Sequence, residues 1–139
     1  MNRQRNERGA VTAWLAGASV LMVTVIGIAV DLGSQVHAKE RAHTIAAQAA
    51  RTGAEQITAD AMTGAAPRLD VGKARQAANA YLRSAGVQGT VTVSGGVRVT
   101  VNVTDSYTPL FLSSIGIGPL TVTASSTAEL KRALEGTER

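Results

Sequence analysis

The sequence predicts an α+β protein with a long N-terminal helix, a second short helix and a three-stranded antiparallel sheet. Three observations lead to this fold class. They are an uncharged apolar run from Ala10 to Val30, a helical periodicity that continues from Ser34 to Gly64, and an alternation of valine with polar residues after Gly89. The 139 residues leave room for one small domain outside the apolar run.

The apolar run predicts a transmembrane helix. Residues 10–30 carry no charge, and a helix needs about 20 such residues to cross the hydrocarbon core. Apolar side chains occur on every face, while Thr12, Ser19 and Thr24 carry hydroxyls that bond back to helix carbonyls. A cleaved secretory signal is the alternative, but its apolar region normally has about 7 to 15 residues. The run is therefore interpreted as a retained anchor.

The flanking charges indicate the topology. Three arginines precede the run, whereas Lys39 and Arg41 follow it, which favours a cytoplasmic N-terminus and a single pass through the cell membrane. The head is then exported. We expect four parts: a cytoplasmic basic tail, too short to fold, at 1–9, a transmembrane helix at 10–30, an extracytoplasmic head at 31–130 and a flexible tail at 131–139.

The helical periodicity after Asp31 extends the membrane helix into the head. Small and apolar residues recur on one face from Val36 to Ala61, and charged residues lie largely on the other faces. Alanine and glycine dominate this stripe, so a sheet or another helix can approach the backbone closely. The candidate helix-packing positions are Ala13, Gly17, Ala29, Gly33, Ala46, Ala49 and Gly53.

The rest of the head contains one helix and three strands. Asp70 predicts the N-cap of a helix that runs to Ala85. The valines from Val91 to Val103 alternate with polar residues around Gly95-Gly96, which is typical of a β-hairpin. A third alternating run covers residues 120–127. We expect the valine face to be covered by the alanine and glycine stripe and by the second helix.

Large apolar side chains gather between the second and third strands. Thr108 and Pro109 predict a short helical turn there, with Thr108 as its cap and Pro109 at its first position. Two interpretations stay open for this segment: a lid over the end of a small core, or an exposed patch for subunit or partner contact. The residues concerned are Leu110, Phe111, Leu112, Ile115 and Ile117.

Asp31, directly after the apolar run, also has two interpretations. It marks the point where lipid ends, or it bonds to polar groups of an adjoining helix within an assembly.

The residue types that carry chemistry are scarce or scattered. The chain has no cysteine, which excludes disulfides and thiolate metal sites. His37 and His43 lie six residues apart, on different faces of a helix, so they do not form the i, i+4 pair of a metal site. No basic stripe interleaved with aromatic residues indicates nucleic-acid binding, and no glycine-rich loop indicates a phosphate site. We expect no enzyme, no cofactor, no metal and no small-molecule substrate.

Several motifs in the first part of the chain resemble a known family. The motifs are Arg8-Gly9 before the apolar span, Gly27-Ile28-Ala29-Val30-Asp31-Leu32-Gly33 at its end, Arg41-Ala42, and the alanine-rich stretch from Ala46 to Ala54. Together they resemble the N-terminal region of the TadE/TadG-like proteins of the tight-adherence (Flp) pilus, over about residues 8–57. The resemblance implies a bacterial cell-envelope protein, a minor pilin or pseudopilin, with a membrane helix and an exported pilin-like head.

The resemblance also implies processing by a prepilin peptidase after a glycine, which in this chain is Gly9, with Ala10 as the new N-terminus. Such substrates usually have Glu five residues past the cut, where this chain has Trp14. Two fates therefore stay open: a filament subunit, or an assembly factor that stays in the membrane. The implied partners are membrane lipid, other pilins or Tad secretion components, and the peptidase. The alternative function is a membrane-tethered extracytoplasmic binding module that uses the loop at 110–117.

Overall fold

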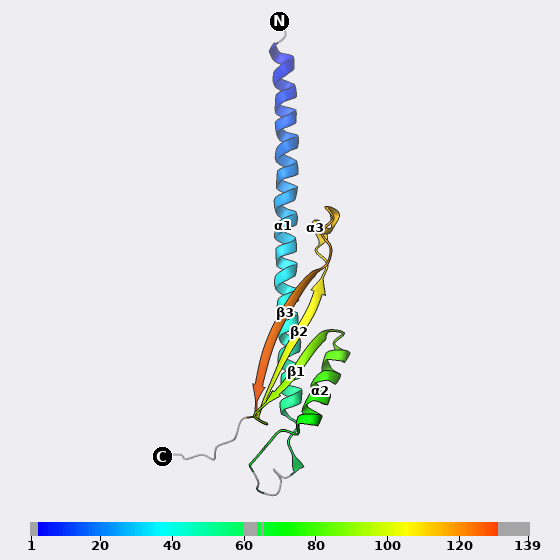
Figure 1. Cartoon of the computed structure of the whole chain (residues 1–139). Coiled ribbons are helices and arrows are strands. Elements are labelled where there is room, and N and C mark those ends of the chain that lie inside the picture. Colours follow the sequence, from blue (N-terminus) through cyan, green and yellow to red (C-terminus); the bar gives the residue numbers. More distant parts are fainter. Residues whose placement is uncertain (1–2, 60–63, 65, 131–139) are drawn as a thin grey trace, which may run out of the picture. The chain divides into compact units, whose positions relative to one another are not determined.

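The longest element of the chain is helix α1, which runs from Arg3 to Ala54. The computed structural model describes residues 3–59, 64 and 66–130, with side chains from Gly9 onward; the tail expected at 131–139 lies outside these residues. The elements that follow α1 are α2 (Val71–Ser84), β1 (Gln88–Ser94), β2 (Arg98–Tyr107), α3 (Leu110–Ser114) and β3 (Leu120–Glu129) (Figure 1). This composition confirms the predicted α+β class.

Both ends of α1 differ from the prediction. The helix begins at Arg3, inside the segment expected to be too short to fold, because extending an existing helix requires no new nucleus. It ends at Ala54 instead of continuing to Gly64. Beyond that end, Ile57 pairs with Leu69 in an isolated antiparallel bridge. The bridge requires extended backbone, so long-range pairing overrides the local helical periodicity here.

Two compact units make up the chain. The first contains Met1–Val36 and Tyr107–Leu120, and so the N-terminal part of α1 together with α3. The second contains His37–Ser106 and Thr121–Arg139, and so the C-terminal part of α1, α2 and almost all of the sheet. Helix α1 therefore contributes to both units.

The sheet has the order β1-β2-β3, and β1 and β2 form the predicted hairpin. Gly95 and Gly96 have φ angles of +62° and +67°, which glycine adopts without strain. The register pairs Ser94 with Arg98, so the loop has one more residue than the two glycines. Val97 consequently lies in the loop, whereas the valine pattern predicted it at the start of the second strand.

The core of the second unit is the valine face of β2. Val99, Val101 and Val103 are fully buried. The buried apolar side chains of the helices in this unit are those of Ala42, Ile45, Ala46, Ala49, Ala50 and Ala54 of α1 and Ala74, Ala78 and Leu82 of α2. A Cβ on Gly53 would lie 3.1 Å from the carbonyl oxygen of Ala74 and 3.2 Å from Cγ1 of Val99. The alanine and glycine stripe and α2 therefore meet over the valine face, where small side chains let the backbones approach.

Helix α2 begins at the predicted cap. The Oδ1 atom of Asp70 accepts the backbone N–H of Lys73 at 3.1 Å. This bond and the ammonium group of Lys73 hold the pKa of Asp70 below its ordinary value, although partial desolvation opposes them. Because the pKa is depressed in the folded state, the cap's contribution to stability is complete at neutral pH. It is lost only as the pH falls below the ordinary aspartate range.

The close approach at Gly53 leads to a test of packing. We expect Gly53→Leu to destabilise the full-length protein in detergent by about 1 to 3 kcal/mol, because the new side chain overlaps α2 and β2. Thermal or denaturant unfolding measures this change. Gly33→Leu is the matched control, since a Cβ on Gly33 meets nothing within 4 Å. Equal stability of the two variants would show that Gly53 is not closely packed.

Candidate functional site

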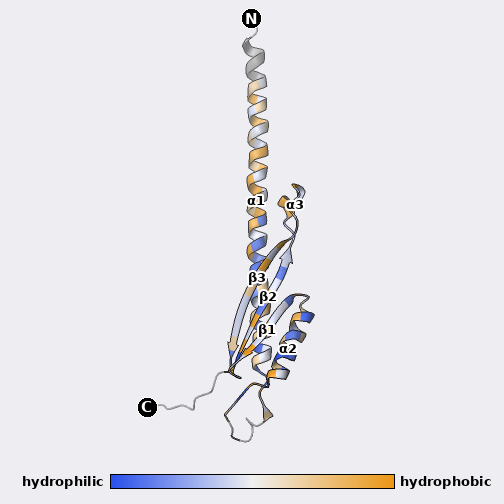
Figure 2. Cartoon of the chain, viewed as in Figure 1, coloured by the Kyte–Doolittle hydropathy of each residue, from blue (hydrophilic) through white to orange (hydrophobic). Residues whose placement is uncertain are grey.

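The N-terminal part of α1 exposes apolar side chains on its surface. The large apolar residues from Val11 to Leu32 are 43 to 73% exposed. This helix contains a stretch long and apolar enough to cross a membrane, and none of that stretch is buried in the structure. The hydroxyls of Ser19 and Thr24 donate to the carbonyls four residues earlier, at 2.8 Å each, as the sequence predicted. Figure 2 shows the hydrophobic colouring along this part of α1 and on α3.

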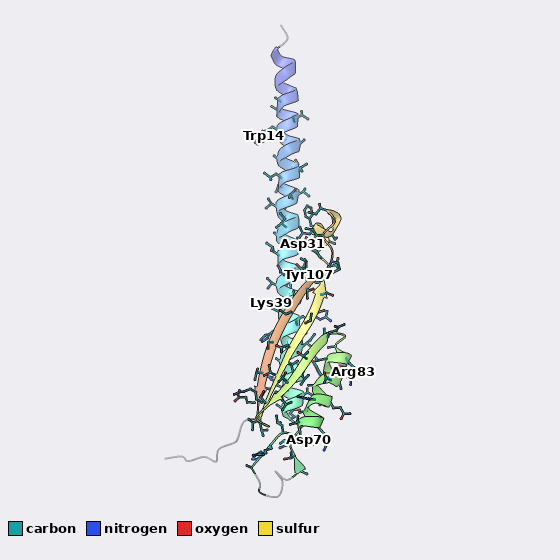
Figure 3. The ribbon with its side chains drawn as sticks, viewed as in Figure 1. Trp14, Asp31, Lys39, Asp70, Arg83 and Tyr107 are labelled. Carbon is teal, nitrogen blue, oxygen red and sulfur yellow. The ribbon has the colours of Figure 1, made fainter. Side chains whose placement is uncertain are left out.

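Asp31, in contrast to these apolar side chains, is buried, with 2% of its surface exposed. Its carboxylate accepts the backbone N–H groups of three consecutive residues of α3, and Figure 3 shows Asp31 beside that loop. Oδ1 lies 2.7 Å from the nitrogen of Leu110, and Oδ2 lies 2.7 Å from that of Leu112. The nitrogen of Phe111 is 3.0 Å from both oxygens. Each carboxylate oxygen therefore accepts two N–H bonds.

Gly27 lies one helical turn before Asp31, on the same face of α1. A Cβ on Gly27 would overlap the ring of Phe111, so only glycine leaves space for this aromatic side chain. Gly27 and Asp31 together form the surface of α1 that holds α3, which we call the α3-contact face. Both sides of this contact lie within the first unit.

The cap of α3 differs from the prediction. Pro109, not Thr108, is the N-cap residue, and no side chain of the cap itself makes a hydrogen bond. The first N–H groups of a helix have no partner within the helix, so they need an outside acceptor. Asp31 supplies it from α1. The sequence pattern predicts Thr108 because a local cap is a neighbour in the chain, whereas Asp31 lies 79 residues before Leu110.

The contact agrees with neither of the two interpretations of Asp31. A residue that only marks the end of the lipid region has no need of burial, yet Asp31 is buried and fully bonded. Its polar partners belong to its own chain rather than to an adjoining helix of an assembly. An ionised carboxylate is an acceptor only, which matches three backbone donors. The arrangement holds a loop in place, and the geometry indicates a structural role.

The apolar loop residues that the sequence singled out divide into two groups. Phe111 and Leu112 are half-buried, and Phe111 packs against Gly27. Leu110, Ile115 and Ile117 are 76%, 66% and 38% exposed. The loop therefore has an exposed apolar surface that includes these three side chains.

The other candidate positions are distributed between the two units. The candidate positions in the first unit are all exposed, and they are Gly9, Ala10, Ala13, Gly17, Ala29 and Gly33. A Cβ on Gly9, Gly17 or Gly33 would meet nothing within 4 Å. By contrast, Ala46 and Ala49 are fully buried within the second unit.

The charged residues just after Asp31 form one weak contact. Nδ1 of His37 lies 3.8 Å from Oε2 of Glu40, and both side chains are mostly exposed. Among the residues that the structure describes, no group of three or more His, Cys, Asp or Glu could hold a metal ion.

The role of Asp31 can be tested by amide hydrogen exchange in detergent micelles or nanodiscs. We expect Asp31→Asn to speed the exchange of the Leu110, Phe111 and Leu112 amides about tenfold or more, because the new amide group turns a donor toward backbone donors. Asp105→Asn is the matched control, since the carboxylate of Asp105 accepts a local bond, from the backbone N–H of the next residue, Ser106. Unchanged exchange in the Asp31 variant would refute this role.

Comparison with known proteins finds a family whose sequence model matches the first part of the chain. Residues 9–61 match the model of the TadE/G-like Flp pilus-assembly family. The matched segment includes both residues of the α3-contact face and ends before α2, the sheet and α3. No curated protein and no solved structure matches the chain. Residues 9–61 thus carry the sequence signature of the TadE/G-like Flp pilus-assembly family, which confirms the resemblance of their motifs.

Proposed function

We propose that this chain is a membrane-anchored minor pseudopilin or assembly factor of an Flp-type surface pilus, which acts by helix packing and protein contact and not by catalysis. The family match over residues 9–61 supports the pilus-assembly role. The observation that carries the membrane role is the exposed apolar surface of α1. Covering one large apolar side chain contributes roughly 1.5 to 3 kcal/mol. A surface with this many such residues is stable only in lipid or against other helices.

The proposed orientation places the N-terminus in the cytoplasm and the second unit outside the cell membrane. The three arginines before the apolar run support it, because positive charge is enriched on the cytoplasmic side. Trp14, which is 73% exposed, lies one turn inside the run on the arginine side. An indole ring favours the headgroup boundary, so its position agrees with this orientation.

The proposed contact with other pilins uses the small residues of α1. Within lipid, helices associate through close packing because the hydrophobic effect no longer drives them together. Ala13 and Gly17 are exposed and lie one turn apart, so a second helix can approach the backbone there. Ala29 and Gly33 repeat this spacing near the end of the run.

The packing proposal predicts a specific loss of partners. We expect Gly17→Leu to reduce recovery of other pilus components with this protein from gently solubilised native membranes by about tenfold, because the leucine keeps the helices apart. Ala18→Leu is the matched control: it adds a leucine to an equally open site about 100° around the helix. If neither variant loses partners, Ala13 and Gly17 are not a contact surface. If both lose them equally, the effect is not specific to that face.

Processing at Gly9 distinguishes the two forms of the proposal. We expect the protein from its native membrane to begin at Ala10, because the resemblance to Flp pilus-assembly proteins implies cleavage after a glycine before the apolar run, and Gly9 is at that position. Intact-mass measurement checks this, and Gly9→Leu, which removes the glycine before the cut, should keep the full mass. A wild-type protein that retains Met1–Gly9 would contradict pilin-type handling and identify a permanent membrane anchor.

A further inference from the structure

The depth of α3 follows from its contact with α1, provided that α1 spans the membrane as proposed above. Gly27 lies three residues before Val30, the last residue of the uncharged run. At 1.5 Å of rise per residue, Gly27 is about 4.5 Å inside the end of that run. Phe111 packs against Gly27, so its ring lies at the same depth. A part of the loop is therefore at the level of the lipid.

The exposed side chains of the loop suit that position. Leu110 and Ile115 are among the most exposed large apolar residues of the chain, at 76% and 66%, and Ile117 is 38% exposed. The sequence has no charged residue between Asp105 and Glu129. The loop therefore has no charged side chain of its own that a contact with lipid would remove from water.

Backbone N–H groups at both ends of α3 are hydrogen-bonded within the protein, as a contact with lipid requires. The N–H groups of Leu110, Phe111 and Leu112 donate to Asp31. At the other end of α3, the N–H groups of Ile115, Gly116 and Ile117 donate to backbone carbonyls at 3.0 to 3.2 Å. An unbonded N–H costs several kcal/mol in hydrocarbon, so non-helical backbone enters a membrane only when it is bonded.

The polar side chains of α3 are bonded internally as well. The hydroxyl of Ser113 donates to the carbonyl of Leu110 at 3.0 Å, and that of Ser114 donates to the carbonyl of Phe111 at 2.6 Å. Ser19 and Thr24 of the apolar run bond back to their own helix in the same manner. The loop thus shares the hydrogen-bonding pattern of the membrane segment.

We propose that the loop from Pro109 to Ile117 is a second membrane contact, which lies beside α1 at the extracytoplasmic boundary between headgroups and acyl chains, with Leu110, Ile115 and Ile117 in contact with lipid. Lipid is favoured over a protein partner because this apolar surface continues the lipid-facing surface of α1 through the Gly27 contact. The proposal rests on the membrane-spanning role of α1.

The absence of cysteine from the sequence allows a direct test with single-cysteine variants of the full-length protein. The variants Ile115→Cys and Ile117→Cys are labelled with the fluorophore NBD. They are reconstituted into phosphatidylcholine vesicles at less than one protein per vesicle. Quenching by a shallow doxyl-labelled lipid is compared with quenching by iodide in water. Ser125→Cys, at an exposed and uncharged position of β3, is the matched control.

We expect blue-shifted emission and lipid quenching at positions 115 and 117, and iodide quenching at position 125. Iodide quenching at 115 and 117 would overturn the proposal, since the loop would then face water. Protection from both quenchers would also overturn it, because protein would then cover the loop. Val23→Cys, in the middle of the apolar run, separates the two proposals. If lipid does not quench the label at position 23, the membrane span itself is refuted. If lipid quenches the label at position 23 but not at 115 and 117, only the proposal for the loop is refuted.

Discussion

The contact between the carboxylate of Asp31 and the backbone of α3 is the interaction on which the first unit depends. It joins α1 to residues 79 to 81 positions later in the chain. A buried carboxylate is costly unless it is hydrogen-bonded, and unbonded N–H groups at a helix start are costly as well. Each group removes the penalty of the other. The loop between β2 and β3 is consequently held against the apolar part of α1.

Two glycines of α1 show how a chain with few aromatic residues builds its contacts. Gly27 admits the ring of Phe111 in the first unit, and Gly53 admits α2 and β2 in the second. Aromatic residues make up only 3% of the sequence, so few large side chains are available to fill a core. At both positions the missing side chain lets a neighbouring group reach the backbone of α1, which is the ring of Phe111 at Gly27 and the carbonyl oxygen of Ala74 at Gly53.

The apolar part of α1 has two kinds of surface, the α3-contact face and the exposed apolar surfaces. The matched segment, residues 9–61, includes Gly27 and Asp31, whereas their partner α3 lies beyond it. One surface of the apolar part of the helix is thus committed to the chain's own loop. The other surfaces are exposed and apolar, and they are free to contact lipid and neighbouring helices. This division agrees with the proposed role of a membrane-anchored pilus-assembly protein.

The sequence by itself determined the type and order of the elements, because side-chain spacing is a local property. The uncharged run at 10–30 predicted a helix, the alternating valines predicted the hairpin, and Asp70 predicted the start of α2. The sequence also singled out Asp31 and the loop at 110–117, but separately. Only the tertiary structure decided that they meet, because hydrophobic periodicity reports on near neighbours and not on a bond across 79 residues. The early end of α1 at Ala54 has the same cause, since a bridge to a later segment requires extended backbone after that residue.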